Sequence, residues 1–142
     1  MTAIDLDKSY LITGSQDRTI KIWNATSLHL IRTLNGFDGS VLCLQFQNDY
    51  LVSGSDAGTI SIWSVRNGNC LRQLFGHNEM VLSIRIDSRK IVSSTYRGEI
   101  KIWNFADALN LEIPDFEVCK TTFSFVGIVY SLQFDDFYLY NR

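Results

Sequence analysis

The sequence has few of the residues that mark several classes of protein. It contains one proline, two histidines and three cysteines in 142 residues, and no uninterrupted apolar run long enough to cross a membrane. Its first ten residues lack both the basic start and the apolar stretch of a secretory signal. These absences argue against a membrane span, a disulfide-rich scaffold and a secreted protein.

The cysteines are too few and too dispersed for a disulfide framework. Cys43, Cys70 and Cys119 are odd in number, far apart, and lie in otherwise apolar, strand-like segments. We expect three buried, reduced thiols. Reduced thiols are typical of the cytosol and the nucleus, so we expect a cytoplasmic or nuclear protein.

Charge is balanced and spread along the chain. Thirteen basic and fifteen acidic residues leave a net charge of −2, and the Lys and Arg residues form no cluster. A nucleic-acid surface needs a concentrated positive patch, so we do not expect a nucleic-acid ligand. The 46% hydrophobic and 20% charged residues indicate a folded, soluble domain.

Patterns that carry catalysis are missing. The chain has no G-x-S-x-G, H-E-x-x-H, Walker or C-x-x-C motif. The Gly-containing turns that follow Thr13 and Ser53 open no helix, so they lack the dipole that holds a phosphate. The paired carboxylates Asp135 and Asp136 are expected in a turn rather than in an acid–base pair. We therefore expect no enzyme, no cofactor and no metal site.

An internal repeat is the strongest feature that is present. The segments RTIKIWN, GTISIWS and GEIKIWN end around Trp23, Trp63 and Trp103, which are forty residues apart. Each segment alternates with a period of two and is rich in β-branched residues, as a half-buried strand requires. Polar, Gly- and Asp-containing turns separate the apolar runs. A repeat near forty residues with four short strands is typical of β-propeller blades.

The period defines the domain organisation that we expect. One all-β domain covers residues 1–142, with repeats at about 1–34, 41–74 and 81–123 and a partial repeat at 128–142. This predicts three full four-stranded blades and part of a fourth, open rather than closed into a ring. The third repeat is expected to carry eight extra residues in a loop that contains Pro114, where a proline disturbs no strand pairing.

At these positions the chain resembles the WD-repeat family. Gly76-His77 matches the Gly-His pair of that family, and Trp23-Asn24, Trp63-Ser64 and Trp103-Asn104 stand where the Trp-Asp pair is usual. In the family a Trp, a Ser or Thr, an Asp and the His form one hydrogen-bonded chain within a blade. The resemblance assigns this structural network to Thr13, Asp17, Trp23, Ser53, Trp63, His77, Ser93 and Trp103.

By this alignment no blade has the complete network. Phe37 and Ala57 replace the His and the Asp of the second repeat together, so we expect no buried polar group to be left without a partner there. Arg97 replaces the Asp of the third repeat and should point to solvent, leaving His77 without an acceptor. We expect Trp23, Trp63 and Trp103 to be equivalent anchors, each buried between adjacent blades.

A narrower resemblance lies in the second half of the chain. Residues 70–109, an expanded loop, and the segments EVC and VGIVYSLQFDDF are similar to the last blades of beta-transducin-repeat-containing F-box proteins, which are substrate receptors of a cullin-type ubiquitin ligase. This implies a fragment or truncated copy of a longer receptor, completed by further blades. The alternatives are a general WD-repeat scaffold of another family and a degenerate copy without a role.

The resemblance also implies which loops face a protein or peptide partner. These residues are Ser15, Asp38, Gly39, Ser40, Ser55, Asn78, Glu79, Met80, Arg97, Gly127 and Ile128. Receptors of the narrower family bind phosphorylated serines through arginines and serines. Here Gly39 and Ile128 stand where those arginines are expected, Asp38 and Glu79 add negative charge, and Ser15 and Ser55 remain as phosphate donors. We expect an apolar or mildly basic segment to bind better than a phosphorylated acidic one, with arginines at 39 and 128 reversing that preference.

Overall fold

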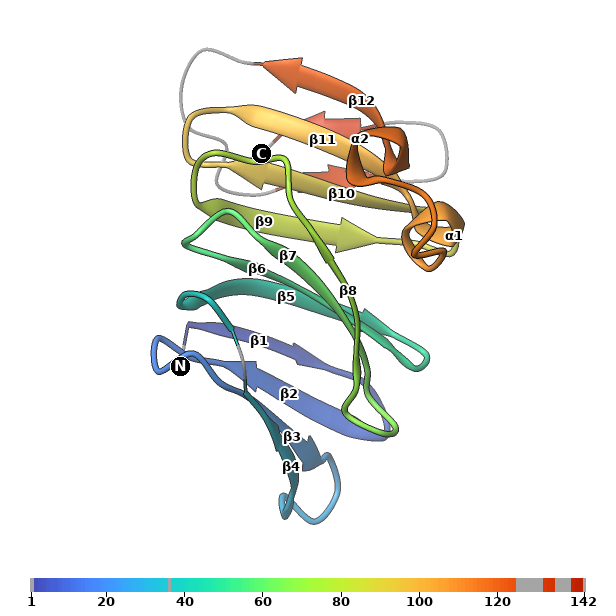
Figure 1. The fold of residues 1–142 in the computed structure, drawn as a ribbon. Coiled ribbons are helices and arrows are strands. Elements are labelled where there is room, and N and C mark those ends of the chain that lie inside the picture. The colour runs from blue at the N-terminus through green and yellow to red at the C-terminus, as the bar shows by residue number, and fades with distance from the viewer. Residues whose placement is uncertain (1, 36, 125–131, 135–138, 142) are drawn as a thin grey trace.

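The computed structural model describes residues 2–35, 37–124, 132–134 and 139–141 (Figure 1). Gly127, Ile128 and the pair Asp135 and Asp136 lie outside the described residues. Three antiparallel four-stranded sheets, called blades 1 to 3 from here on, follow one another along the chain. Within the described part no sheet closes on itself, so the predicted open, all-β fold is confirmed.

Strands pair in chain order within each blade. Blade 1 consists of β1 Ala3–Leu6, β2 Tyr10–Gly14, β3 Ile20–Asn24 and β4 Leu30–Leu34. Blade 2 consists of β5 Val41–Gln47, β6 Tyr50–Ser55, β7 Ile60–Ser64 and β8 Cys70–Leu74. Blade 3 consists of β9 Val81–Ile86, β10 Lys90–Thr95, β11 Glu99–Asn104 and β12 Cys119–Ser124. A further two-stranded pair joins β13 Leu132–Phe134 and β14 Leu139–Asn141.

Every tryptophan of the repeat sits at a break in strand register. The pairing of the third strand with the fourth shifts immediately before Trp23, Trp63 and Trp103. Such an irregularity bends and twists a strand locally. Its recurrence at one repeat position shows that the forty-residue period specifies backbone geometry as well as side-chain type.

The hydrophobic core lies between the blades. One cluster joins apolar side chains of blades 1 and 2, and another joins blades 2 and 3. Two glycines let the sheets approach closely: a Cβ at Gly14 would lie 2.6 Å from Val41 Cγ1, and one at Gly54 would lie 2.6 Å from Val81 Cγ1. Each glycine of a second strand therefore makes room for the valine that opens the next blade.

The connection between β11 and β12 differs from the prediction. Residues 105–118, called the insertion from here on, form two short helices, α1 Phe105–Ala108 and α2 Asp115–Val118, which the strand pattern did not indicate. Trp63 pairs with Cys70 seven residues later, whereas Trp103 pairs with Cys119 sixteen residues later, so the expansion is nine residues rather than eight. Neither helix in the described chain is long and apolar enough to cross a membrane.

Candidate protein-interaction edge

Blade 3 contains a continuous hydrogen-bonded network. The indole Nε1 of Trp103 donates to Ser93 Oγ at 2.9 Å, Ser93 Oγ lies 2.6 Å from His77 Nε2, and His77 Nδ1 lies 2.7 Å from Glu99 Oε1. Because the indole N–H only donates, a neutral imidazole protonated on Nδ1 satisfies the whole series, with the serine hydroxyl donating to Nε2. The expectation that His77 lacks an acceptor is wrong, since Glu99 supplies one from two residues beyond Arg97.

Burial governs the ionisation of His77. Desolvation lowers the pKa of His77 below its usual value, and the hydrogen bond and the charge of Glu99 oppose that change without cancelling it. The neutral imidazole is therefore the form that the blade favours near neutral pH. This agrees with the donor and acceptor directions of the network.

Blade 2 holds its tryptophan differently. The ring of Phe37 packs on Trp63 with centroids 4.8 Å apart. The buried indole Nε1 of Trp63 has no hydrogen-bond partner, so Ser53 does not play the part that Ser93 plays in blade 3. The prediction that the second repeat leaves no polar group without a partner is therefore wrong. Phe37 stands where blade 3 has His77, so Ser53 has no imidazole to orient its hydroxyl, and the indole N–H of Trp63 is left without a partner.

A carboxylate still braces the turn between β6 and β7. Asp38 accepts hydrogen bonds from Ser55 Oγ at 3.2 Å and from Thr59 Oγ1 at 2.5 Å. The negative charge absent at Ala57 is thus supplied from the loop before β5. Ser55 is buried and its hydroxyl is already engaged, which argues against its predicted role as a phosphate donor.

Blade 1 joins its tryptophan to the second strand by a single hydrogen bond. Trp23 Nε1 donates to Thr13 Oγ1 at 3.1 Å, and Asp17 accepts from the backbone and hydroxyl of Thr19. The hydrogen bond from the Thr19 side chain is the main cause that lowers the pKa of Asp17. Trp23 is only half-buried, unlike Trp63 and Trp103, so the expected equivalence of the three tryptophans is wrong.

Most of the predicted partner-facing residues gather at one edge of the blades. This loop edge comprises residues 15–18, 37–40, 55–58, 77–80 and 95–98, which lie before the first strand of a blade or between its second and third strands. Asn78 is exposed, and Arg97 Nε lies 3.1 Å from Glu79 Oε1 in an exposed ion pair. Met80 accepts a hydrogen bond from the backbone of Tyr96, which ties two of these loops together.

Gly39 is not an open loop position. It is buried, and a Cβ at this residue would lie 2.0 Å from Asp56 Oδ1. That same oxygen accepts a hydrogen bond from the backbone of Ser40 at 2.9 Å, while Ser40 Oγ donates to the carbonyl of Gln16. An arginine at Gly39 would displace the Asp56 carboxylate from the backbone of Ser40, and the expected gain in phosphopeptide binding from that substitution stays a prediction. Ser15 Oγ accepts from the backbone of Asp17 at 3.2 Å.

The loop edge is acidic. Its charged side chains are Asp17, Arg18, Asp38, Asp56, Glu79 and Arg97, with four carboxylates against two guanidinium groups. Asp38 and Asp56 are fixed by hydrogen bonds to neighbouring loops, so their charges are held in place. In the part of the chain that the structure describes, no three His, Cys, Asp or Glu residues converge in a way that could hold a metal ion.

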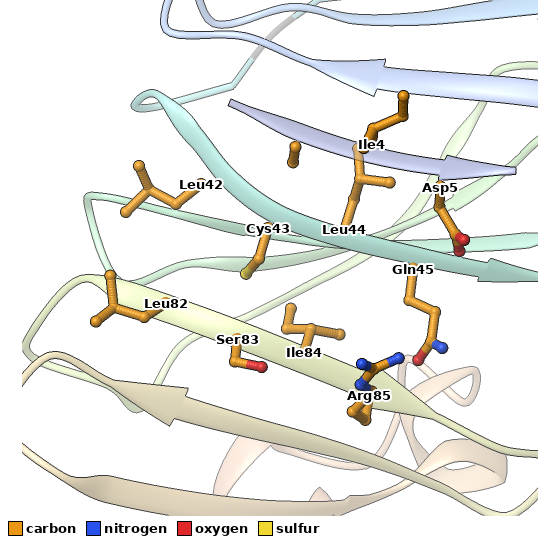
Figure 2. A pocket seen from close by; sticks show the side chains of 11 residues that line it. Ile4, Asp5, Leu42, Cys43, Leu44, Gln45, Leu82, Ser83, Ile84 and Arg85 are labelled. Carbon is orange, nitrogen blue, oxygen red and sulfur yellow. The ribbon is translucent and has the colours of Figure 1, made fainter. Parts of the chain in front are cut away.

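The first strands of the three blades carry a second repeated feature. β1, β5 and β9 line a groove of about 250 Å³ in which Asp5, Gln45 and Arg85 stand at one repeat position (Figure 2). Asp5 Oδ2 accepts from the backbone of Phe46 at 3.0 Å, and Gln45 Oε1 accepts from the backbone of Ile86 at 2.6 Å. Asp5 and Gln45 thus each bond to the first strand of the next blade. Sequence reasoning missed these residues, although their forty-residue spacing was a usable signal.

The comparisons agree with this architecture. The family model described as "WD domain, G-beta repeat" matches residues 2–24, 28–64 and 68–104, so the chain belongs to the WD-repeat family. WD-repeat domains are in general non-catalytic modules that bind other proteins. A comparison with curated proteins gave no match.

Solved structures share the fold. The crystal structure of the computationally designed Ika4 protein is 29% identical, with a TM-score of 0.82, over 95% of this chain and 79% of that chain. The designed Ika8 protein is 28% identical, with a TM-score of 0.82, over 95% of this chain and 40% of that chain. The RRP9 WD40 repeats are 22% identical, with a TM-score of 0.80, over 92% of this chain and 41% of that chain. The chain therefore spans about two fifths of the length of Ika8 and RRP9.

Proposed function

We propose that the loop edge binds an unphosphorylated polypeptide segment that is apolar to mildly basic. The observation that carries this proposal is the charge of the edge, where Arg97 is already paired with Glu79 and where Asp38 and Asp56 form no ion pair with any described residue. A dianionic phosphate placed here meets like charge, and like-charge contacts across an interface cost affinity. A Lys or Arg of the partner instead gains from the same carboxylates.

The narrower proposal is that this module is the substrate-binding part of an F-box/WD-repeat receptor of a cullin-type ubiquitin ligase. It is supported by the similarity of residues 70–109 and by the long connection in the third repeat. Pull-down of the tagged gene product from cells, probed for the cullin scaffold, tests it. Recovery of the scaffold supports a receptor, and stable complexes without it indicate a general WD-repeat scaffold protein.

We also propose a cytoplasmic or nuclear location. Burial raises the pKa of the Cys43 thiol to about 12, and Cys43, Cys70 and Cys119 are all free thiols, although the expectation that all three are buried is wrong because Cys70 is exposed. A thiol of this kind stays protonated and unreactive in a reducing compartment. Imaging of the tagged gene product tests this proposal, and accumulation in the secretory pathway contradicts it.

Peptide titration tests binding at the loop edge directly. Fluorescence anisotropy compares three labelled peptides of equal length: one basic and apolar, one acidic, and the same acidic peptide phosphorylated on two serines. We expect the basic peptide to bind most tightly, with an affinity that falls as salt is raised. Tighter binding of the phosphorylated peptide overturns the proposal.

Asn78 and Glu79 provide the variants for this experiment. Asn78→Arg adds an exposed guanidinium without disturbing a buried contact and should improve binding of the phosphorylated peptide several-fold. Glu79→Gln should weaken binding of the basic peptide while retaining the shape of the side chain. Leu30→Gln, an exposed change on β4 away from the loop edge, is the matched control and should alter neither affinity.

A further inference from the structure

A pocket of about 240 Å³ lies at the opposite edge of the blades. Its walls are Gln47, Asn48 and Tyr50 of blade 2, the turn residues Asp87–Ser88 of blade 3, and Phe105, Ala106 and Leu109 from α1 and the residue after it. Figure 1 shows α1 at the far ends of the strands from the loops that connect β6 to β7 and β10 to β11. The pocket is therefore separate from the loop edge.

The insertion that builds this pocket is held in place by Arg72 of β8. The buried guanidinium donates to the carbonyls of Asn110 at 2.8 Å and Ile113 at 2.6 Å, and it forms an ion pair with Asp115 at 2.6 Å. The second carboxylate oxygen of Asp115 accepts from the backbone of Phe75 at 3.0 Å. A buried charge is costly unless it is paired and hydrogen-bonded, so the insertion has a strongly preferred position.

Blade 1 contains an equivalent arginine that makes fewer contacts. Arg32, forty residues before Arg72, donates to the carbonyls of Arg66 and Asn67 in the short turn between β7 and β8. In both cases an arginine of the fourth strand holds the connection between the third and fourth strands of the next blade. The fourth-strand arginine is thus a feature of the repeat. In blade 3 the insertion lengthens the connection that this arginine holds.

The helical wall of the pocket is also fixed locally. The side chain of Asn104 caps α1 by accepting from the backbone of Asp107 at 2.9 Å, and the backbone of Phe105 donates to the carbonyl of Arg89. The Phe105 ring packs edge-on against Tyr50 with centroids 5.3 Å apart. A pocket whose walls are already fixed loses little entropy when it is filled.

The insertion that forms one wall of the pocket is acidic, whereas the facing turn of blade 3 carries Asp87 paired with Lys90 and an exposed Arg89. The insertion contains Asp107, Glu112, Asp115 and Glu117 and no basic residue. Asp107 pairs with Lys120 and Asp115 pairs with Arg72, whereas the exposed Glu112 and Glu117 form no ion pair with any described residue. Leu111 of the insertion is 71% exposed. The insertion therefore combines apolar contact area with two carboxylates that form no ion pair.

We infer that this pocket binds one apolar side chain, of the size of Leu or Phe, from a partner's polypeptide segment whose flanking residues are Lys or Arg. The volume is below the range of pockets for whole drug-sized ligands, which favours a single side chain. The exposed Asn48 amide at the rim can bond to a peptide backbone. The carboxylates of the insertion select basic flanks and disfavour acidic ones.

Nuclear magnetic resonance of the isotope-labelled chain tests this inference with capped peptides. The probes contain Lys-Leu-Lys, Lys-Ala-Lys or Glu-Leu-Glu at their centre. We expect Lys-Leu-Lys to shift the amide signals of Ala106, Leu109 and Asn48 and to bind at least fivefold more tightly than either other peptide. Equal binding of Lys-Ala-Lys or of Glu-Leu-Glu, or shifts confined to the loop edge, overturns the inference.

Ala106→Phe is the variant that fills the pocket. Ala106 is exposed, so the larger ring can be accommodated with the fold intact, as the rest of the spectrum will report. This variant should lose binding of Lys-Leu-Lys, while the matched control Ala57→Phe, an exposed alanine on the loop edge, should retain it. Unchanged binding by Ala106→Phe also overturns the inference. Loss of loop-edge binding in Glu79→Gln leaves this site unaffected, so the two proposals fail independently.

Discussion

Blades 2 and 3 contain the same tryptophan at the same repeat position but stabilise it by different interactions. In blade 3 the indole of Trp103 begins a hydrogen-bonded series that passes through Ser93 and His77 to Glu99. In blade 2 the indole of Trp63 packs on Phe37 and its N–H has no partner. The comparison shows that large-area burial is common to both blades, whereas the polar network is an additional feature of one. Packing is therefore the shared source of their stability.

The largest expected effect comes from truncating the tryptophans. Trp63→Ala and Trp103→Ala should each lower the free energy of unfolding by about 3–5 kcal/mol, because each removes a buried aromatic ring. Trp23→Ala should cost clearly less, since Trp23 is only half-buried. Urea denaturation followed by circular dichroism measures the three values. Equal losses at all three positions would show that the three tryptophans are equivalent anchors after all.

The close approach of the two blades provides the next effect. Gly54→Ala places a methyl group 2.6 Å from Val81 Cγ1 and 2.7 Å from Cys43 Sγ, so the blades must separate slightly. We expect a loss of about 1–3 kcal/mol, the usual cost of overpacking a core. The double variant Gly54→Ala with Val81→Ala should recover part of this loss. A neutral single variant would show that the interface between blades 2 and 3 is looser than described.

Exchanging tryptophan for phenylalanine separates packing from hydrogen bonding. Trp103→Phe removes a donor from a buried network and should cost about 1–2 kcal/mol more than Trp63→Phe, which removes an N–H that has no partner. Both changes remove a similar amount of ring surface, so the difference isolates the network. Thermal unfolding of the two variants under the same conditions measures it. Equal costs would mean that the series in blade 3 adds nothing to stability.

The smallest expected effect is a pH dependence confined to blade 3. The pKa of His77 is lowered in the folded state from the ordinary value of 6.5, so the unfolded chain takes up the proton first. The contribution of neutral His77 is therefore fully present above about pH 6.5 and is lost as the pH falls below it. Blade 2 has Phe37 at this position and no corresponding titration.

His77→Phe tests this dependence by giving blade 3 the aromatic residue of blade 2. The free energy of unfolding of the variant should fall less between pH 7.5 and pH 5.5 than that of the parent chain, because the contribution of His77 is absent. At pH 7.5 it should be less stable than the parent chain by about 1 kcal/mol, because Glu99 and Ser93 lose a partner. Denaturant titrations at several pH values provide the measurement, with Phe75→Leu as an exposed control. An unchanged pH profile would assign the titration to another group.

Sequence reasoning succeeded where a property repeats along the chain. The period placed the strands, the turns and the tryptophans, and the longer connection in the third repeat was located although its length was one residue short. It failed where a residue takes over a role from a different position. Glu99 replaces the carboxylate absent at Arg97, and Asp38 replaces the one absent at Ala57. Alignment compares residues at equal spacing, so it could not detect a carboxylate that reaches the same space from a neighbouring loop.

By itself the sequence determined that this is an all-β repeat protein of the WD-repeat kind, because strand periodicity and turn residues are local properties that survive at a fixed spacing. Only the tertiary structure decided which indole N–H is bonded, that Asp56 covers Gly39, and that Arg72 holds the insertion. These outcomes depend on distances between groups that lie 10 to 43 residues apart in the chain. Hydrogen bonds and steric contacts act over a few ångströms, so they are set once the blades have packed together.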